Sequence, residues 1–333
     1  MGSYSGQRVA VRKRANQRSD IMANDSASFY FIIVGFSGLQ EKFYPLLGAL
    51  MFCFYNVSIC ANTIVIVIVL LKDQLHQPMY IIIANLAVSD LLFDTITLPK
   101  LISKYWLGAE SISFSACFLQ MAFVHILNCL DSLTLLLMAF DRYVAICKPL
   151  RYHAIISSRT TILLCLAAWC AASFVGTFVM SWGVFLPYCG PNRIKTFYCS
   201  LAPVAVLSCT DSSTVRKNGL YAGLIMHMGP FSLIVVSYII VIISICAISR
   251  VNNWQKALNT CITHWFVITI FYIPRIVDYG YNSQVVPNAE IAAVVICIYS
   301  FVPHMSSPII FCLRNKEIKK SLENVCKQII HFK

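Results

Sequence analysis

The chain has 333 residues, of which 58% are hydrophobic and 12% are charged, and its mean hydropathy is +0.72. A soluble globular domain is about half apolar and about one quarter charged, so this composition excludes an ordinary soluble protein and favours a polytopic membrane protein. The net charge of +12 does not indicate nucleic-acid binding, because the basic residues lie in short segments between apolar runs.

The first 21 residues are polar and hold five Lys or Arg residues. No apolar stretch follows these residues directly, so they are not a signal peptide. Translation could also begin at Met22, which would place the acceptor sequence Asn24-Asp25-Ser26 close to the N-terminus. We predict that Asn24 is glycosylated. We also predict an extracellular tail over residues 1–45, of which residues 1–21 could lie upstream of the true start.

Seven apolar segments follow, each near the roughly 20 residues that an α-helix needs to span a bilayer. Backbone groups in lipid must pair within their segment or in a closed barrel, so segments of this length are helices. We predict an all-α membrane protein with a seven-helix bundle over residues 46–312 and a cytoplasmic tail over 313–333 that begins with a short amphipathic helix. The predicted spans are 46–71, 79–101, 116–141, 161–182, 219–248, 258–279 and 289–312.

The distribution of Lys and Arg between the spans predicts the orientation. With the N-terminus outside, the cytoplasmic segments hold twelve of these residues and the outer loops hold six. This asymmetry predicts a multi-pass protein of the plasma membrane with an extracellular N-terminus. The basic residues before Met22 oppose that orientation, which is a second reason to consider a start at Met22.

The stretch that organises the chain is Met138 to Cys147, in which Asp141 and Arg142 stand at the end of an apolar helix that begins near Cys117. A helix of 24 residues rises about 36 Å, which is enough to cross the hydrocarbon core. Charges in such a place are costly and usually mark function, although a pair at a helix end can also reach the interface. Two interfacial charges without a function are therefore the alternative reading.

The residues that follow, Lys148 to Tyr152, resemble the second cytoplasmic loop of the odorant-receptor branch of the rhodopsin-like G-protein-coupled receptors. Further segments resemble the same family in the same order along the chain, and together they cover about residues 29 to 320. These segments are Leu75 to Tyr80 with Asn85 to Asp90, Lys256 to His264, and Pro308 to Glu317. The resemblance implies a receptor rather than an enzyme, without a cofactor. It also implies a small odorant as ligand and a heterotrimeric G protein of the olfactory stimulatory type that raises cyclic AMP.

Three cysteines at ten-residue spacing, Cys189, Cys199 and Cys209, resemble the second extracellular loop of this family. The resemblance implies one disulfide between Cys117 and Cys199 and a second between Cys189 and Cys209. Such bridges would fix the loop over the bundle as a lid. A metal site is a poor alternative, because the spacing contains no Cys-x-x-Cys unit.

Two acids, Asp90 and Asp131, lie deep in the second and third predicted helices, and Asn62 in the first could join them. Neighbouring carboxylates in a low dielectric cannot both stay ionised without a cation or a shared proton. We therefore predict a small polar site for Na⁺ or a proton, and no other metal. A static hydrogen-bonded core is the alternative, whereas a catalytic dyad is disfavoured because no nucleophile or metal ligand accompanies it.

The resemblance assigns the switch of the receptor to Arg142, which would pair with Asp141 at rest and face the G protein on activation. The residues implied in coupling are Asp141, Arg142, Tyr143, Tyr238, Lys256 and His264. The chain departs from the family's Asn-Pro-x-x-Tyr pattern, because Ser307 and Phe311 replace its Asn and Tyr. Ser307 still offers a donor and an acceptor to the polar site, but Phe311 has no hydroxyl, so the details of activation should differ.

In the predicted third helix, a set of residues recurs at i, i+1, i+4, i+5 and i+8, which is the spacing of one helix face. This face points into the upper bundle and is formed by Val124, His125, Asn128, Cys129 and Ser132. By resemblance, the ligand pocket is completed by Met226, His227, Tyr272, Arg275, Ile276 and Tyr279. Lone polar residues in such helices often only join helices together. A guanidinium needs an anion, which Asp278 could supply at i+3, so the alternatives for Arg275 are a local pair and a site for an acidic odorant.

The function predicted from these residues is an odorant receptor whose partners are a small odorant, a G protein and membrane lipid, but not nucleic acid. A chemoreceptor of the same family in another tissue is the nearest alternative. A transporter or membrane enzyme is disfavoured, because the sequence shows neither internal repeats with broken helices nor a nucleophile or metal set.

Overall fold

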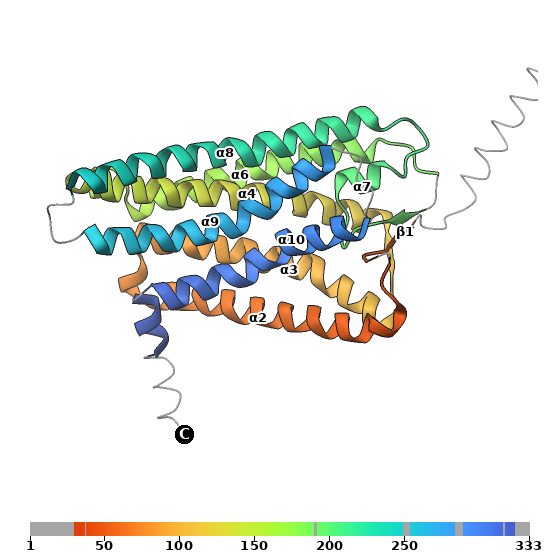
Figure 1. The fold of residues 1–333 in the computed structure, drawn as a ribbon, viewed down its shortest axis with the longest axis horizontal. Coiled ribbons are helices and arrows are strands. Elements are labelled where there is room, and N and C mark those ends of the chain that lie inside the picture. Colours follow the sequence, from red (N-terminus) through yellow and green to blue (C-terminus); the bar gives the residue numbers. More distant parts are fainter. Residues whose placement is uncertain are drawn as a thin grey trace, which may run out of the picture.

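The computed structural model describes residues 30–36, 38–189, 192–248, 254–283, 289–315 and 317–323, with side chains except at 247–248, 254–260, 278–283 and 289–293. In the described part of the chain, seven long helices lie side by side along the length of the molecule (Figure 1), which confirms the predicted seven-helix bundle. They are α2 (Tyr44–Leu71), α3 (Pro78–Leu107), α4 (Phe114–Cys147), α6 (Ser158–Val184), α8 (Ser213–Ile248), α9 (Trp254–Ser283) and α10 (Ala289–Arg314).

Within the described residues, six of these helices are long and apolar enough to cross a bilayer, and α9 holds a shorter apolar stretch, Cys261–Val277. Large apolar side chains on their outer faces are exposed, for example Phe174 at 72% and Ile225 at 70%. In water such a surface would aggregate, whereas in lipid it is the expected outer surface of a helix bundle. The polar residues are concentrated inside the bundle instead, where they form the sites described below.

The helix ends follow local sequence signals. Pro78 starts α3 at a position where no backbone N–H is needed, and Gly108 ends the same helix in the left-handed conformation with φ of 66°. Ser113 caps α4 by accepting a hydrogen bond from the backbone N–H of Ala116 at 3.3 Å, and Ser157 caps α6 in the same way. Several helices also extend beyond the predicted spans, because the helical backbone continues past the apolar core of the membrane.

Short elements connect the long helices. The 3₁₀ turns are η1 (Glu41–Phe43), η2 (Asp73–Leu75) and η3 (Pro149–Arg151), and the short α-helices are α5 (Tyr152–Ile155) and α7 (Leu201–Ala205). A further short helix over 317–323 follows α10, with Ile318 fully buried against the core. This helix agrees with the predicted helix after the seventh span, within the part of the tail that is described.

A three-stranded sheet at one end of the bundle was not predicted. The strand β1 (Tyr30–Ile33) lies between β2 (Ser111–Ser113), which is antiparallel to it, and β3 (Arg193–Ile194), which is parallel. Lys104 at the end of α3 donates hydrogen bonds to the carbonyls of Ile33 and Val34, at 2.6 Å each. The segment before the first span is therefore tied to the bundle.

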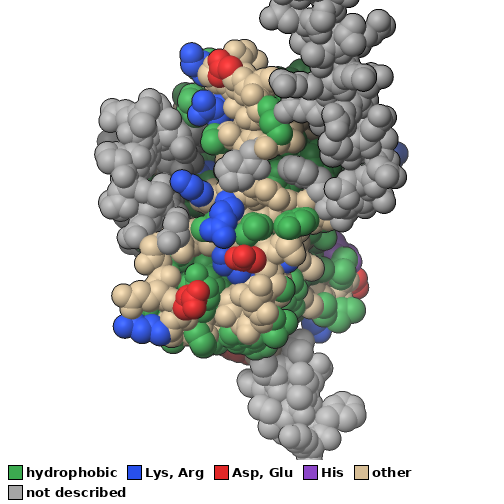
Figure 2. Space-filling view, turned by 90° about the vertical axis from the view of Figure 1, so that its right-hand side faces the viewer, with side chains coloured by type: hydrophobic (Ala, Val, Ile, Leu, Met, Phe, Trp, Pro, Cys, Tyr) green, Lys and Arg blue, Asp and Glu red, His purple; other side chains and the backbone are tan. Residues whose placement is uncertain are grey.

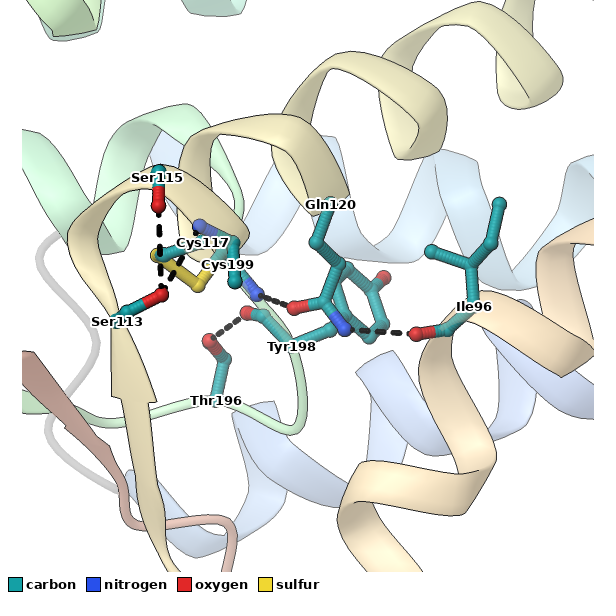
Figure 3. Close-up of a disulfide and its surroundings, with 9 residues drawn as sticks. Ile96, Ser113, Ser115, Cys117, Gln120, Thr196, Tyr198 and Cys199 are labelled. Carbon is teal, nitrogen blue, oxygen red and sulfur yellow. Dashed lines mark hydrogen bonds between the residues drawn. A yellow bond between two sulfur atoms is a disulfide. The ribbon is translucent and has the colours of Figure 1, made fainter.

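The loop between α6 and α8 covers the same end of the bundle. Disulfides join Cys117 to Cys199 and Cys189 to Cys209, with Cα–Cα distances of 5.4 and 5.5 Å. Gln120 of α4 accepts a hydrogen bond from the backbone N–H of Cys199 and donates one to α3, each at 2.9 Å (Figure 3). We call this the disulfide end of the bundle, and we call the opposite end, where α4 finishes, the Arg142 end.

Candidate functional site

At the Arg142 end, Asp141 is held by two neighbours. Arg142 donates to one carboxylate oxygen of Asp141 from Nη2 at 2.6 Å and from Nε at 3.0 Å. Tyr152 of α5 donates its hydroxyl to the other oxygen at 2.7 Å. Burial and the hydrogen bond to the Asp141 carboxylate both raise the pKa of the Tyr152 phenol, so it stays a donor at neutral pH. The sequence analysis quoted Tyr152 only as part of a motif and did not recognise this contact.

The other side chains expected at this end lie on neighbouring helices. Tyr238 of α8 is buried, and its hydroxyl has no hydrogen-bond partner among the described atoms. His264 of α9 is buried with its ring 6.0 Å from that of Phe311. Tyr143 is half-buried beside the core of this end, and the side chain of Lys256 lies outside the described residues. Arg142 therefore lies in an interhelical setting in which its partner could change if the helices moved apart.

In the middle of the bundle, the structure places Asp90 and Asp131 around a histidine of α10. His304 Nε2 lies 3.7 Å from Asp90 Oδ1 and 3.6 Å from Asp131 Oδ2, and all three side chains are buried. A third acid, Asp94, lies 3.0 Å from His304 Nδ1. The sequence analysis missed His304 and Asp94. The sequence does carry a signal for both, because each is an ionisable residue inside an apolar helix, and His304 lies only three residues before Ser307.

The other residues predicted for this polar site adjoin it. Asn62 of α2 donates to the backbone carbonyl of His304 at 3.1 Å and to that of Ser58 at 3.0 Å. Ser307 lies beside Asn62, Asp90 and Phe311 around a gap that is too narrow for a water molecule. Na⁺ or proton binding at this site stays a prediction.

A larger cavity of about 380 Å³ opens towards the disulfide end between α4, α6, α8, α9 and α10. Of the residues predicted for the ligand pocket, those that line it are Val124, His125, Asn128, Cys129, Met226, His227 and Arg275. Neither Tyr272 nor Ile276 lines the cavity, because Tyr272 is fully buried in the core and Ile276 is 40% exposed on the outer face of α9. The side chains of Tyr279 and Asp278 lie outside the described residues.

Arg275 is the charged group deepest in this cavity, with an exposed fraction of 4%. Its Nη1 lies 2.8 Å from His227 Nε2, its Nη2 donates to Asn128 Oδ1, and its guanidinium lies 4.1 Å from the ring centre of Phe271. Its Nε is buried without a hydrogen-bond partner among the described atoms. No described carboxylate forms an ion pair with it. Among the described residues, the partners of the guanidinium are thus an amide, an imidazole and an aromatic ring rather than a carboxylate.

Two more basic residues that the sequence analysis did not assign to the pocket, Arg216 and Lys217, line the cavity from the first turns of α8. Asp211 precedes them, and hydrogen bonds from Ser213 lower the pKa of its carboxyl group, with a further contribution from the two cations. Figure 2 looks onto this end of the molecule, where Lys and Arg side chains gather near the middle of the described surface. The residues that line the cavity include no acid among those described.

Comparison with known proteins shows the family and the fold of the chain. The family described as "Olfactory receptor" matches residues 51–329. Human olfactory receptor 6B1 is 33% identical over 308 residues, covering 91% of this chain and 96% of the relative. Mouse olfactory receptor 10D3 is 34% identical over 311 residues, covering 93% and 97%. The crystal structure of squid rhodopsin shares the fold with a TM-score of 0.68 at 16% identity, covering 88% of this chain and 87% of that one. The chain therefore belongs to the olfactory receptor family of G-protein-coupled receptors, which are multi-pass membrane proteins and not enzymes.

Proposed function

We propose that the receptor binds a small acidic odorant in the cavity beside Arg275 and activates a heterotrimeric G protein of the olfactory stimulatory type, which raises cyclic AMP. The observation that carries the proposal is the buried guanidinium at the cavity wall, without a described carboxylate as partner. A buried charge without a counter-ion is costly, and a carboxylate ligand would remove that cost. Guanidinium binds carboxylates through two parallel hydrogen bonds, which also orients the ligand.

The rest of the cavity supports a ligand with one acidic group and an apolar body. Val124, Val179, Leu201 and Met226 offer apolar surface, while Arg216 and Lys217 add positive charge near its opening. Charges of one sign around a cleft attract ligands of the opposite sign. A volume of about 380 Å³ is at the small end of the range for ligand pockets, which fits a short or medium-chain acid rather than a bulky ligand.

His227 and Asn128 explain how the empty pocket and the bound pocket would differ. In the structure without ligand, both side chains form hydrogen bonds with the N–H groups of Arg275, in the place that an anion would take. A carboxylate is a stronger acceptor than either, because charge-assisted hydrogen bonds are stronger than neutral ones. On binding, the ligand would take over these N–H groups and also reach Nε. This exchange would change contacts between α4, α8 and α9 at the same time.

The signalling half of the proposal rests on the Arg142 end. Arg142 is paired with Asp141, and the buried hydroxyl of Tyr238 lies on a neighbouring helix with a spare donor and acceptor. A ligand that binds better to the state with α8 and α9 parted would shift the equilibrium towards that state. Arg142 would then leave Asp141 and face the G protein.

The same proposal includes an orientation. Disulfides form in oxidising compartments, which supports a disulfide end outside the cell and an Arg142 end in the cytoplasm. The excess of Lys and Arg in the loops at the Arg142 end agrees with this orientation. The N-terminal tail, including Asn24, would then be extracellular in the plasma membrane, although Asn24 itself lies outside the described residues.

The experiment is a cyclic AMP assay in cells that express the receptor with an olfactory-type G-protein α subunit. Acidic, neutral and basic odorants are compared, with Arg142→Ala as the uncoupled control. We expect a ligand-dependent rise for acids that is lost in Arg142→Ala at equal surface expression. Responses confined to neutral or basic odorants would refute the acidic ligand. A rise that survives in Arg142→Ala would refute the coupling role of Arg142. A response only with another α subunit would favour the alternative, a chemoreceptor of the same family in another tissue.

A further inference from the structure

One residue of the loop between α6 and α8, which we call the lid, lies among the helices rather than over them. Tyr198 is buried and directly precedes Cys199, whose disulfide joins the lid to α4. Gln120 of α4 also accepts the backbone N–H of Cys199, and the Thr196 hydroxyl donates to the Tyr198 carbonyl at 2.8 Å. Figure 3 shows the Tyr198 side chain next to Gln120. The backbone around Tyr198 is therefore fixed, on one side directly to α4.

The hydroxyl group of Tyr198 joins the lid to α10. It shares a hydrogen bond of 2.7 Å with the hydroxyl of Ser300, and both side chains are buried. The ring of Tyr198 packs edge-on against Phe93 of α3, with 5.7 Å between the ring centres. A buried hydroxyl that loses its partner keeps the cost of leaving water, so breaking this bond is more costly than breaking an exposed one. The contact thus favours the arrangement in which the lid and α10 are together.

The position of this contact makes it sensitive to a movement of the helices. Tyr198 lines the ligand cavity, and so does Tyr299 of α10, whose ring centre lies 5.5 Å from the guanidinium of Arg275 on α9. The helix α10 packs against α9, whereas the lid is tied to α4. A movement of α9 away from α4 would therefore displace α10 relative to the lid. The hydrogen bond between Tyr198 and Ser300 would then break.

We propose that the hydrogen bond between Tyr198 and Ser300 is a latch between the lid and α10 that stabilises the resting receptor. The structure holds this bond together with the pair of Arg142 and Asp141, which is the resting arrangement at the other end of the bundle. A contact that is present in one state and broken in the other shifts the equilibrium towards the first. The inference rests on the helix movement in the proposed function, but not on the charge of the odorant. Tyr198 is a positioning residue, because it acts through Ser300 and α10.

The test compares hydroxyl deletions in the full-length receptor, purified in detergent. Tyr198→Phe and Ser300→Ala each remove one side of the latch. Tyr188→Phe is the matched control in the lid, because the Tyr188 hydroxyl bonds to a backbone carbonyl of α6. Ser306→Ala is the matched control in α10, because the Ser306 hydroxyl bonds to a backbone carbonyl of the same helix. All four substitutions remove one hydroxyl group, so they differ in whether that group joins the lid to α10.

Amide hydrogen exchange is measured at the Arg142 end, over residues 138–147 of α4 and 261–268 of α9. We expect exchange there to be about five- to tenfold faster in the two latch variants than in the wild type, and unchanged in the two controls. The double variant should exchange no faster than the single ones, because both substitutions remove the same bond. A bond that only holds the fold together would change exchange in the lid and α10, but not at the Arg142 end.

Basal cyclic AMP in cells is the second readout. Tyr198→Phe should signal more than the wild type without ligand at equal surface expression, and adding Arg142→Ala should remove the excess. Faster exchange at the Arg142 end with unchanged cyclic AMP would support the latch and refute the proposed G protein. Exchange equal to that of the wild type in Tyr198→Phe and Ser300→Ala would overturn the latch, and so would additive effects in the double variant. If Tyr198→Phe does not fold, as judged by its thermal transition, Ser300→Ala decides alone.

Discussion

At the scale of single residues, the partner of a buried charged side chain can be predicted from the sequence when it lies nearby in the chain, but not when it lies far away. Asp141 and Arg142 are adjacent, so their pairing could be predicted from the sequence alone. The partners of Arg275 could not, because His227 and Asn128 lie 48 and 147 residues away. Sequence spacing offered only Asp278 on the same helix. His304 was missed for the same reason, since its three acids become neighbours only when α3, α4 and α10 pack.

Tyr152→Phe tests the resting pair at this scale. The change removes the hydroxyl that donates to Asp141 and keeps the ring. A hydrogen bond to a charged group contributes about 1.5–3 kcal/mol, and losing it in the resting state alone would raise the ratio of active to resting receptor by roughly tenfold or more. We expect more cyclic AMP without ligand than in the wild type at equal surface expression.

The control for this variant is Tyr188→Phe, which removes a hydroxyl that donates to the Gly183 carbonyl at 2.7 Å near the disulfide end. Its basal cyclic AMP should match that of the wild type. Equal basal signals in Tyr152→Phe and the wild type would show that the hydrogen bond from Tyr152 does not stabilise the resting state.

At the scale of elements, the long helices could be predicted and the short strands could not. The strands have four, three and two residues, which is too short for a period-two pattern to stand out. Their pairing joins segments far apart in the chain, such as Tyr30 with Ser113 and Ile32 with Arg193. The helix ends at Pro78, Ser113 and Gly108 carry local signals, so their positions follow from the sequence.

Lys104→Met tests the attachment of β1. Lys104 donates two hydrogen bonds of 2.6 Å to the carbonyls of Ile33 and Val34, and methionine keeps most of its apolar stem. Loss of these bonds should make local opening of β1 easier by about 2 kcal/mol, which corresponds to roughly 30-fold faster amide exchange. Hydrogen exchange over residues 30–36 measures this effect. Lys100→Met is the control, because the hydrogen bond of Lys100 in the described part of the chain goes to the carbonyl of Ala109 and not to β1. Equal exchange in the two variants would contradict the role of Lys104.

The two disulfides should contribute unequally to stability. They close loops of 82 and 20 residues, and chain-entropy arguments give about 4.5 and about 3.3 kcal/mol respectively. Replacing both Cys117 and Cys199 by Ser should therefore lower the midpoint of thermal unfolding in detergent more than replacing both Cys189 and Cys209. A larger loss from the shorter loop would mean that the inner lid, rather than its tether to α4, stabilises this end.

At the scale of the whole molecule, the bilayer makes the fold predictable. Apolar segments of about 20 residues have few alternatives to helices in lipid, so their number and order defined the bundle before any packing was known. The cavity was predicted only in part. Seven of its expected side chains line it, but Arg216 and Lys217 were missed because they precede the apolar part of α8. Their position at the opening depends on how α8 packs beside α4.

The measurement that tests the account most directly compares a carboxylic acid with its methyl ester, which has nearly the same shape without the charge. Dose–response curves of cyclic AMP are recorded for the wild type, for Arg275→Met and for the control Arg216→Met at equal surface expression. Removing one partner of a buried charge pair costs about 2 kcal/mol or more, so Arg275→Met should weaken the response to the acid by roughly 30-fold or more and leave that to the ester little changed. Arg216→Met, at the opening, should have a much smaller effect. If Arg275→Met responds to the acid as the wild type does, Arg275 does not hold the ligand, and the proposed acidic odorant site is wrong.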